Sequence, residues 1–466
     1  MSKHHIKQRR HSQLGLFDSV SLAAGIIVGV SIYKVSPSVF SNVTAAWHGL
    51  AAWLAGGALS LIGALCVAEL AAAYPRSGGQ YIYLNRAYGP WMGFLFGWAQ
   101  LFPVITGTIG AMAYVFADYA VECLDISPIH GPMLAAEAVT ALTALNLLGV
   151  VVGKTAQNIL TIAKVLGLGG IVAAGLLSSE TPRSIAIHPP STGAGGIGLA
   201  MIMILYAYGG WSDVAYVASE SRRRRRNIPL ALILGVAVVT LLYMAINIAY
   251  LAGLGLDGLR MSAAPAADVL IVVLGPFGGK VMSVLVMISA LGAINGMIFA
   301  GARVYAAMGQ DHPQFGLLAR WSHRQRSPIW SLSIQGFVSV ALIAIVGSDA
   351  GRSIVDKAHG WVGLAPPQWE KYGGGFEALV IGPAPIFWLF FLLTGAAVYI
   401  LRWREPARRR PFRVPLYPIT PLIFCGTSLY MLYAAVAYAG TLALLGVVPL
   451  ALGMSLYLVS QKARDK

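Results

Sequence analysis

The sequence predicts an all-α polytopic membrane protein of about twelve transmembrane helices. Of its 466 residues, 57% are hydrophobic and only 11% are charged, whereas an ordinary soluble domain carries roughly 25% charged residues. The mean hydropathy is +0.70. The apolar residues also come in long blocks, several of which meet the requirement of about 20 residues for a helix to cross a hydrocarbon core.

Twelve apolar blocks follow one another along the chain, and each is expected to form one span. The N-terminus is basic and polar and the first block is itself a plausible span, so no cleavable signal peptide is expected. The tenth helix is expected to begin before its apolar centre, near Glu377. The expected spans are Phe17–Phe40, Trp47–Ala73, Pro90–Cys123, Pro132–Val152, Gln157–Leu177, Gly198–Ser219, Pro229–Gly253, Gly278–Met308, Ile329–Val346, Phe387–Arg402, Pro418–Tyr438 and Thr441–Val459.

The positions of the basic residues predict the orientation. A net charge of +15 could indicate nucleic-acid binding, so the location of the charges decides. If the N-tail (1–16) is cytoplasmic, the even-numbered helix ends and the C-tail (460–466) return to that side and bring most Lys and Arg with them, as the positive-inside rule requires. The run Arg222–Arg226 therefore anchors the topology and could contact anionic lipid. We expect a cell-membrane protein with both termini cytoplasmic and no nucleic-acid partner.

Two segments on the opposite side differ from simple connectors. The segment 263–275 is apolar but too short to span, so it is expected to form an interfacial helix over an outer vestibule. The segment 348–375 is polar and contains Gly and Pro among its charges. A long solvated loop is the expectation there.

The first segment that could carry function is Gly25-Ile26-Ile27-Val28-Gly29-Val30-Ser31, in the middle of helix 1. Two glycines four residues apart allow backbone to leave the helix, which would expose amide and carbonyl groups that could hold a carboxylate and an ammonium. The same glycines also fit a GxxxG packing face. This motif alone does not separate the two interpretations.

A second interruption falls in helix 6, at Tyr206-Ala207-Tyr208-Gly209-Gly210-Trp211-Ser212-Asp213. Two glycine-interrupted spans in corresponding positions of two halves indicate a transporter with inverted repeats. Between helices 2 and 3, the aromatic and basic segment 74–90 follows Pro and Gly-Gly and is expected to form a short cytoplasmic interfacial helix.

Together these segments resemble the amino acid–polyamine–organocation superfamily, and within it the L-type amino acid transporter-like permeases. The resemblance runs from the helix 1 glycines through YPRSGGQYIYLNRAYGP (74–90) and LYAYGGWSDVAYVASE (205–220) to NGMIFAGARVYAAMGQDH (295–312). It implies a LeuT-like five-plus-five inverted repeat, with repeats at 17–178 and 198–402 and two further helices at 416–459. Substrate would lie between the broken helices 1 and 6, with helices 3 and 8 beside it.

The resemblance also implies individual roles. The helix 1 backbone would meet the α-amino and α-carboxyl groups of the substrate, and Tyr206 would be an aromatic lid. Family members usually have Gly-Ser-Gly where this chain has Gly29-Val30-Ser31, and often Phe in place of Tyr206. Backbone recognition survives these changes, but side-chain selectivity need not. The expected substrate-binding residues are Gly25, Ile27, Gly29, Val30, Ser31, Tyr206, Ala207, Gly209, Ser289 and Asn295.

Lys164 is expected about seven residues inside helix 5, roughly 10 Å along its axis. An ammonium at that depth is costly without partners or water. Snorkelling toward the cytoplasm is the alternative to a functional role. In sodium-independent relatives a lysine at this place looks like a substitute for a bound sodium ion, linking helix 5 to the unwound part of helix 1. The resemblance therefore implies exchange or proton-linked transport.

Four further charged residues are candidates for a gate, namely Glu69, Asp213, Glu220 and Arg303, together with the Tyr206 lid. They are expected at or near cytoplasmic helix ends, where ordinary end-capping ion pairs would explain them equally well. The three cysteines have no metal or redox spacing and are expected to be small buried hydrophobes, although Cys123 lies where a disulfide to a partner could form. The N-terminal histidines His4, His5 and His11 have no metal-ligand spacing. No cofactor, metal or accessory subunit is expected.

A carrier of amino acids has two rivals from other classes. An intramembrane enzyme would need a clustered acid, base or metal set, and the sequence has no HExxH, GxSxG or paired aspartates. An amino acid sensor would keep the same pocket, but these 466 residues contain no large cytoplasmic signalling domain. The pocket positions Ile27, Val30, Ala207 and Ser289 carry no acid, which favours a neutral amino acid over a polyamine or cationic amino acid.

Overall fold

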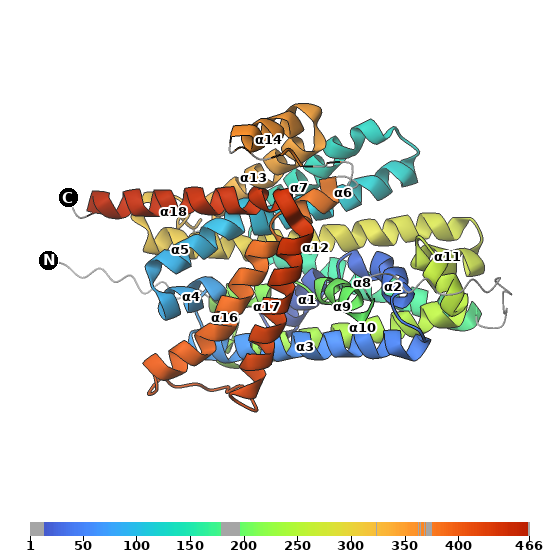
Figure 1. Ribbon diagram of the computed structural model, residues 1–466, viewed down its shortest axis with the longest axis horizontal. Coiled ribbons are helices and arrows are strands. Elements are labelled where there is room, and N and C mark those ends of the chain that lie inside the picture. Colours follow the sequence, from blue (N-terminus) through green and yellow to red (C-terminus); the bar gives the residue numbers. More distant parts are fainter. Residues whose placement is uncertain are drawn as a thin grey trace.

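The computed structural model describes residues 14–464 except 179–195, 323, 362, 364, 368 and 370–374. This part of the chain is helical, and its strand-like pairing is limited to an isolated bridge between Leu14 and Ser221. Many of the long helices run roughly along the long axis of the molecule (Figure 1). Helices satisfy their backbone hydrogen bonds within one segment, which is what a lipid environment requires of a chain this apolar.

The helices of the first half of the chain begin with a broken pair and end with a long span. They are α1 (Leu16–Ile27), α2 (Ser31–Ser41), α3 (Ala46–Ala73), α4 (Gln80–Tyr88), α5 (Pro90–Ala99), the π-helical segment η1 (Gln100–Val104), α6 (Ile105–Leu124), α7 (Gly131–Leu147) and α8 (Val150–Leu177). The helix α4 confirms the short helix that was expected between helices 2 and 3.

The second half also begins with an interrupted helix. Its elements are α9 (Gly196–Ala207), the 3-10 helix η4 (Trp211–Glu220), α10 (Arg224–Met261), α11 (Pro265–Leu274), α12 (Phe277–Asp311), α13 (Ile329–Gly347), α14 (Asp349–Trp361), α15 (Gly375–Ile381), α16 (Ala384–Arg404), α17 (Ile419–Ala439) and α18 (Leu444–Arg464). The helix α15 confirms that the tenth span begins well before Phe387.

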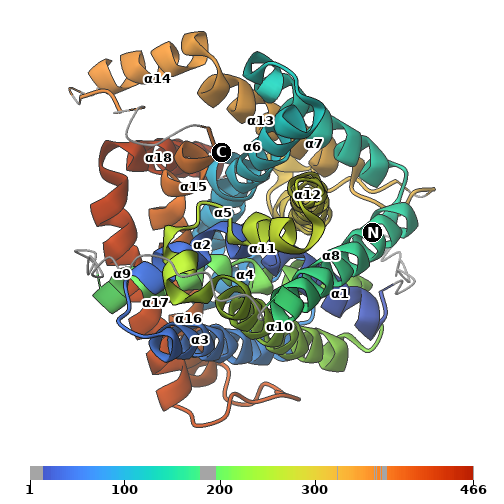
Figure 2. The same ribbon diagram turned by 90° about the vertical axis from the view of Figure 1, so that its right-hand side faces the viewer.

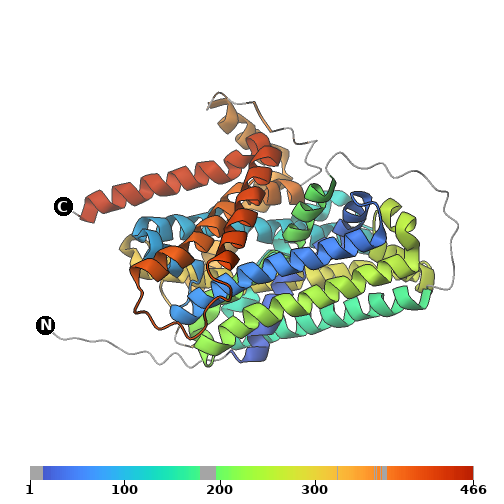
Figure 3. The ribbon, with the colours of Figure 1, turned by 60° about the horizontal axis from the view of Figure 1, so that its bottom comes forward.

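In the described part of the chain, nine helices are long and apolar enough to cross a membrane, and the pair α1 and α2, bent by 52°, makes a tenth. The helix α7, with 17 residues, falls outside this number. The apolar stretch Ile419–Gln461 counts once, although α17 and α18 point in different directions (Figures 1 and 3). The chain is therefore a multi-pass membrane protein, while the number twelve and the repeat boundaries stay predictions.

A view along the long axis shows which helices enclose the centre (Figure 2). The helix α10 packs on α3, α1 and α8, and α12 packs on α6, α8 and α1. The helices α17 and α18 lie at the edge of the bundle, where α17 contacts α16 and α3. The centre is therefore bounded by α1, α6, α10 and α12.

One helix boundary differs from the expectation and changes the position of Lys164. Helix 4 ends at Leu147 and not at Val152, and helix 5 begins at Val150 and not at Gln157. The cause is Gly149, whose φ of +130° excludes it from either helix and whose backbone approaches the carbonyl oxygen of Gln325. Lys164 is thus fourteen residues from the start of the 28-residue helix α8, about 21 Å along its axis, and the expected depth of about 10 Å was wrong.

The two outer segments were predicted with different success. The short apolar helix expected at 263–275 is α11, which lies at the opposite end of the bundle from α4 (Figure 1). The solvated loop expected at 348–375 was wrong for its first half, because Asp349–Trp361 forms α14. Its His359 is buried, and the ring nitrogens lie 2.9 Å from the carbonyl oxygen of Val355 and 3.2 Å from that of Thr441.

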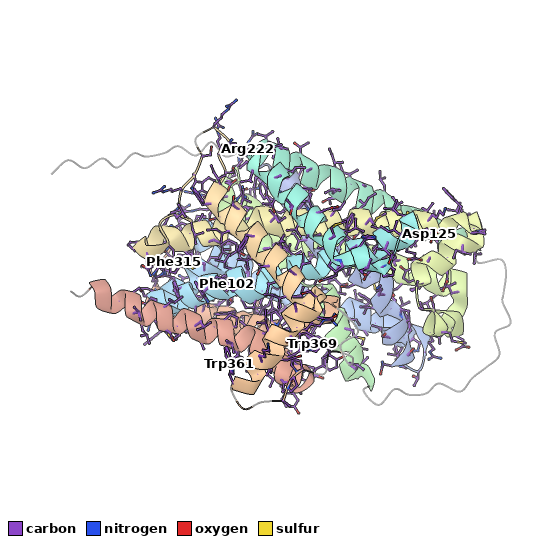
Figure 4. The ribbon with its side chains drawn as sticks, turned by 90° about the horizontal axis from the view of Figure 1, so that it is seen from above. Phe102, Asp125, Arg222, Phe315, Trp361 and Trp369 are labelled. Atoms are coloured by element: carbon purple, nitrogen blue, oxygen red, sulfur yellow. The ribbon has the colours of Figure 1, made fainter. Side chains whose placement is uncertain are left out.

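Two charged residues expected on opposite sides of the membrane are well separated along the long axis (Figure 4). Arg222 and Asp125 lie toward opposite ends of the molecule (Figure 4). The residues Arg222–Arg226 are exposed at the start of α10. Lys3, Lys7, Arg9 and Arg10 of the N-tail and the three N-terminal histidines lie outside the described residues.

Candidate functional site

The break in helix 1 spans Val28, Gly29 and Val30, between α1 and α2. The two glycines of the motif have different roles. A Cβ on Gly25 would lie 2.2 Å from Gln157 Nε2 and 2.4 Å from Thr161 Oγ1, so Gly25 allows α1 to pack closely on α8. A Cβ on Gly29 would meet nothing closer than 3.9 Å, and Gly29 lies in the break itself. The packing and the unwinding interpretations are thus each correct for one glycine.

The carbonyl groups freed by this break are satisfied by side chains from other helices. Lys164 Nζ donates to the carbonyl oxygens of Gly25 and Val28, at 2.7 and 2.9 Å. Ser289 Oγ lies 3.2 Å from the carbonyl oxygens of Val28 and Gly29. Lys164 is only 1% exposed. Because it lies at mid-helix and is bonded to the break, snorkelling does not describe it.

A third side chain joins the two interrupted helices. The hydroxyl of Tyr243, on α10, lies 3.1 Å from the carbonyl oxygen of Ile27 and 3.0 Å from that of Ala207. Its single proton is shared between the last residue of α1 and the last residue of α9. No pattern in the sequence indicates this residue, which is one aromatic among the apolar residues of a span.

Helix 6 is interrupted at Tyr208–Gly210, which separates α9 from the 3-10 helix η4. Gly210 has a φ of +90°, a conformation that glycine adopts without strain. A Cβ at this position would also lie 2.6 Å from a side-chain atom of Ile26. The turn therefore depends on glycine for its backbone and for its contact with α1.

A cavity of about 140 Å³ lies between the two breaks. That volume exceeds the space of one water molecule severalfold and suits a small solute. Its lining is mostly apolar with a few polar groups, the pattern of a small-molecule site. The lining residues are Ile26, Ile27, Gly29, Ser31, Gln100, Val104, Ile105, Thr108, Met112, Leu205, Tyr206, Ala207, Gly209, Gly210, Asp213, Tyr216, Ala293, Met297, Val380, Pro383, Ala384, Phe387 and Trp388.

Six of the ten expected substrate-binding residues line this cavity, namely Ile27, Gly29, Ser31, Tyr206, Ala207 and Gly209. The other four do not. Gly25 packs on α8, Val30 is buried beside the break, and Ser289 bonds the carbonyl groups of the break. Asn295 belongs to a separate buried cluster, in which it accepts from Asn146 at 2.8 Å and donates to Gln157 Oε1 at 2.8 Å.

The expected gate residues separate into three places. Arg303 donates to both carboxylate oxygens of Glu220, at 2.9 and 3.1 Å, and the pair is buried. Glu69 accepts from Arg402 at 2.8 and 2.5 Å and from the backbone N–H of Val414 at 2.7 Å. These bonds join α3 to α16 and to the connector before α17.

Asp213 takes part in neither of these ion pairs. It lies in the cavity wall, one 3-10 turn before Tyr216 and on the same face. This position differs from the one expected, at or near a cytoplasmic helix end, because η4 begins just after Gly210 and brings Asp213 into the cavity wall. An acid in the wall also removes the premise on which a neutral substrate was preferred.

The C-terminal end of α3 carries Tyr74, a tyrosine whose pKa departs from its usual value. Tyr74 donates to Glu405 Oε2 at 3.0 Å. Burial, with the hydrogen bond to Glu405, raises the pKa of Tyr74 to about 12. The hydroxyl therefore remains a donor at physiological pH.

Helix 3 contributes residues that the sequence analysis missed. Gln100, Thr108 and Met112 line the cavity from η1 and α6. The π-helical segment contains Pro103, which has no N–H for a regular helical bond. A proline inside an apolar span was therefore a usable signal for an irregular helix at this place. Among the described residues no group of His, Cys, Asp or Glu could hold a metal ion.

Comparison with known proteins gives concordant matches. Residues 14–455 match the family model described as amino acid permease. The chain is 30% identical over 432 residues to the human b(0,+)-type amino acid transporter 1, covering 91% of this chain and 82% of that protein. It is 28% identical over 426 residues to the serine/threonine exchanger SteT of Bacillus subtilis, covering 90% of each. It is 27% identical over 431 residues to the mouse large neutral amino acids transporter small subunit 2, covering 88% of this chain and 74% of that protein.

Proposed function

Because the chain belongs to the amino acid permease family, in its L-type amino acid transporter-like branch, we propose that it exchanges amino acids across the cell membrane without sodium. The observation that carries this proposal is the cavity enclosed by the two helix breaks, Val28–Val30 and Tyr208–Gly210. One of its relatives is named a serine/threonine exchanger. The relatives reported above are all named as transporters or exchangers.

Recognition of the α-amino acid group would depend on backbone. The first N–H groups of α2 have no partner within their helix, as at every helix N-terminus, and suit a carboxylate. The carbonyl groups around Ile27 and Ala207 suit an ammonium. Gly29 and Ser31 line the cavity beside them. Such recognition is independent of the substrate's side chain, as a carrier for several amino acids requires.

The lid and the gate would act on opposite sides of the substrate. Tyr206 lines the cavity and is 36% exposed, so its ring can cover a bound solute. Glu220 and Arg303 form a buried pair that must break if solvent is to reach the cavity between η4 and α12. In alternating access, the Tyr206 lid would be closed when the Glu220–Arg303 pair is broken, and the pair would be formed when the lid is open.

Lys164 is the basis for proposing independence from sodium. Its ammonium already donates to carbonyl oxygens of the helix 1 break, and carbonyl oxygens of unwound helices are the ligands that coordinate sodium in other carriers. A fixed positive charge there would hold α8 and α1 together in place of the ion. Proton-linked uptake is the alternative coupling.

The experiment that tests the function is counterflow in proteoliposomes. Vesicles loaded with an unlabelled amino acid should accumulate the same labelled amino acid, equally with and without sodium. Sodium-dependent accumulation would contradict the proposal. Uptake into vesicles empty of amino acid, driven by an inward proton gradient, would identify proton-linked transport. Chemical conversion of the label would identify an enzyme, and binding without accumulation a sensor.

The cytoplasmic location of both termini and the cell membrane as the site of action remain part of this proposal. The name of one relative identifies it as a small subunit. The expected absence of an accessory subunit in this chain therefore also stays a prediction.

A further inference from the structure

We propose that Asp213 binds a positively charged group on the substrate's side chain, so that the carrier selects cationic amino acids. This inference rests on the proposed amino acid exchange and names the substrate class of the same cavity. It concerns a residue that the sequence placed at a gate and the structure places in the cavity wall.

Asp213 forms no ion pair with any cation in the part of the chain that the structure describes. Among the described residues, the carboxylates in ion pairs are Asp18, Glu69, Glu220, Asp257 and Glu405. Asp213 receives a hydrogen bond from Ser212 Oγ at 3.2 Å, and this donor is neutral. A carboxylate inside a membrane protein is costly unless a partner of opposite charge compensates it.

The buried basic side chains of α8 and α12, Lys164 and Arg303, are committed elsewhere. Lys164 is bonded to the carbonyl groups of the helix 1 break. Arg303 is bonded to both oxygens of Glu220. A partner for Asp213 in the cavity must therefore come from outside the described protein, and the cavity that it lines is the substrate's own.

The described part of the wall around Asp213 offers hydrogen-bond acceptors and no positive charge. Gln100 lines the cavity from η1, and its side chain makes no hydrogen bond with the described residues. Its amide oxygen and the Asp213 carboxylate are both acceptors, whereas an ammonium or guanidinium has donors only. The hydroxyl of Tyr216 donates to Gln80 Oε1 at 2.9 Å, and as a neutral group it cannot compensate the negative charge of Asp213. The Phe387 and Trp388 part of the lining is aromatic and uncharged.

Asp213 lies within reach of a long substrate side chain. Asp213 follows Gly210 by three residues of a 3-10 helix, which rises about 2 Å per residue, so it lies ~6 Å along the axis from the helix 6 break. The α-amino and α-carboxyl groups would be held at the breaks. A side chain with a four-carbon stem, such as that of lysine, covers a distance of this order.

The test compares lysine with norleucine, which has the same carbon chain without the ammonium. We expect the purified wild-type protein to bind lysine at least tenfold more tightly than norleucine, and proteoliposomes to exchange labelled lysine. Asp213→Asn should weaken lysine binding at least tenfold more than norleucine binding. Asp213→Glu, which keeps the charge, should retain a preference for lysine. The control Asp257→Asn removes an acid that pairs with Arg260 outside the cavity and should leave the ratio unchanged.

Three results would overturn the inference. Equal wild-type affinities for lysine and norleucine would show that the carboxylate recognises no cation. If a folded Asp213→Asn protein loses affinity for lysine and for norleucine by the same factor, the role of Asp213 is structural. If Asp213→Asn abolishes the pH dependence of norleucine exchange and leaves the preference for lysine unchanged, the carboxyl group serves proton transfer. In each case exchange of neutral amino acids by the wild type leaves the proposed function standing, whereas absence of any amino acid exchange overturns both.

Discussion

The ammonium of Lys164 donates to the carbonyl oxygen of Gly25 across 2.7 Å, at the midpoint of α8 and one turn before the break in helix 1. Gly25 itself packs on Gln157 and Thr161 of the same helix. The two helices are therefore joined by close packing and by a buried charge. The ammonium of Lys164 can be removed by substitution without changing the close packing of the two backbones.

Lys164→Ala should lower amino acid exchange about tenfold or more while changing the substrate Kd much less, because the lost bonds couple conformations and do not contact the substrate. Exchange and equilibrium binding are measured on the same preparation. Lys280→Ala, on the exposed start of α12, is the matched control. Full exchange by the Lys164 variant would contradict the proposed role.

Tyr243→Phe should slow exchange several-fold and leave the protein folded. The ring would keep its contacts with Trp53 and Tyr208, but buried carbonyl groups at both breaks would lose their donor, at a cost of about 1–3 kcal/mol. Tyr250→Phe is a close control on the same helix, since its buried hydroxyl has no hydrogen-bond partner among the described residues. Equal effects of the two substitutions would show that the bridge is unimportant.

Tyr206→Ala should strongly reduce uptake in a folded, inserted protein, whereas Tyr206→Phe should keep most of it. The ring contributes contact area and excludes water from the cavity. Initial rates of uptake and thermal unfolding are the two measurements. Normal transport by the alanine variant would show that the cavity beside α9 is not the substrate site.

Glu220→Gln should open the end of the protein at which Arg303 lies. Removing one partner of a buried ion pair leaves the other unpaired, at a cost of about 3–5 kcal/mol in the closed conformation. A cysteine introduced at Ala293 in the cavity lining should then react faster with a thiol reagent from that side. Arg86→Gln, which breaks an exposed pair with Glu405, should have little effect. An unchanged labelling rate would exclude the pair as a gate.

Labelling of introduced cysteines should find the Arg222–Arg226 segment and both tails protected in intact cells. The segment 348–375 should be accessible. Each cysteine is scored before and after permeabilisation, which serves as the control for reactivity. Labelling of the arginine segment from outside would reverse the orientation.

Helix positions were predictable because apolar blocks and Gly or Pro boundaries are local properties of the chain. The breaks at Gly29 and Gly210 were predictable for the same reason. The boundary at Gly149 was missed because the residues on both sides are apolar, and only its conformation and its contact with Gln325 show the end of a helix.

The site was predictable to the extent that it is built from backbone. Six residues of the lining were named from the sequence as substrate-binding, and all lie in or next to the two breaks. Tyr243, Gln100 and the cavity position of Asp213 were not, because each depends on how helices distant in sequence face one another. Asp213 shows the reason most clearly, since its direction is set by the 3-10 geometry that follows Gly210.

The π-helical segment Gln100–Val104 sets the rotational phase of helix 3. A regular α-helix advances about 100° per residue, which would place Thr108 roughly 80° and Met112 roughly 120° around the axis from Gln100. One extra residue in a π turn subtracts about 100°, so that all three come within about 20° of a common direction. Deleting one residue from this segment would leave helix 3 continuous and apolar, yet would rotate its outer half away from the cavity. The length of helix 3, counted to the single residue, is therefore part of the binding site.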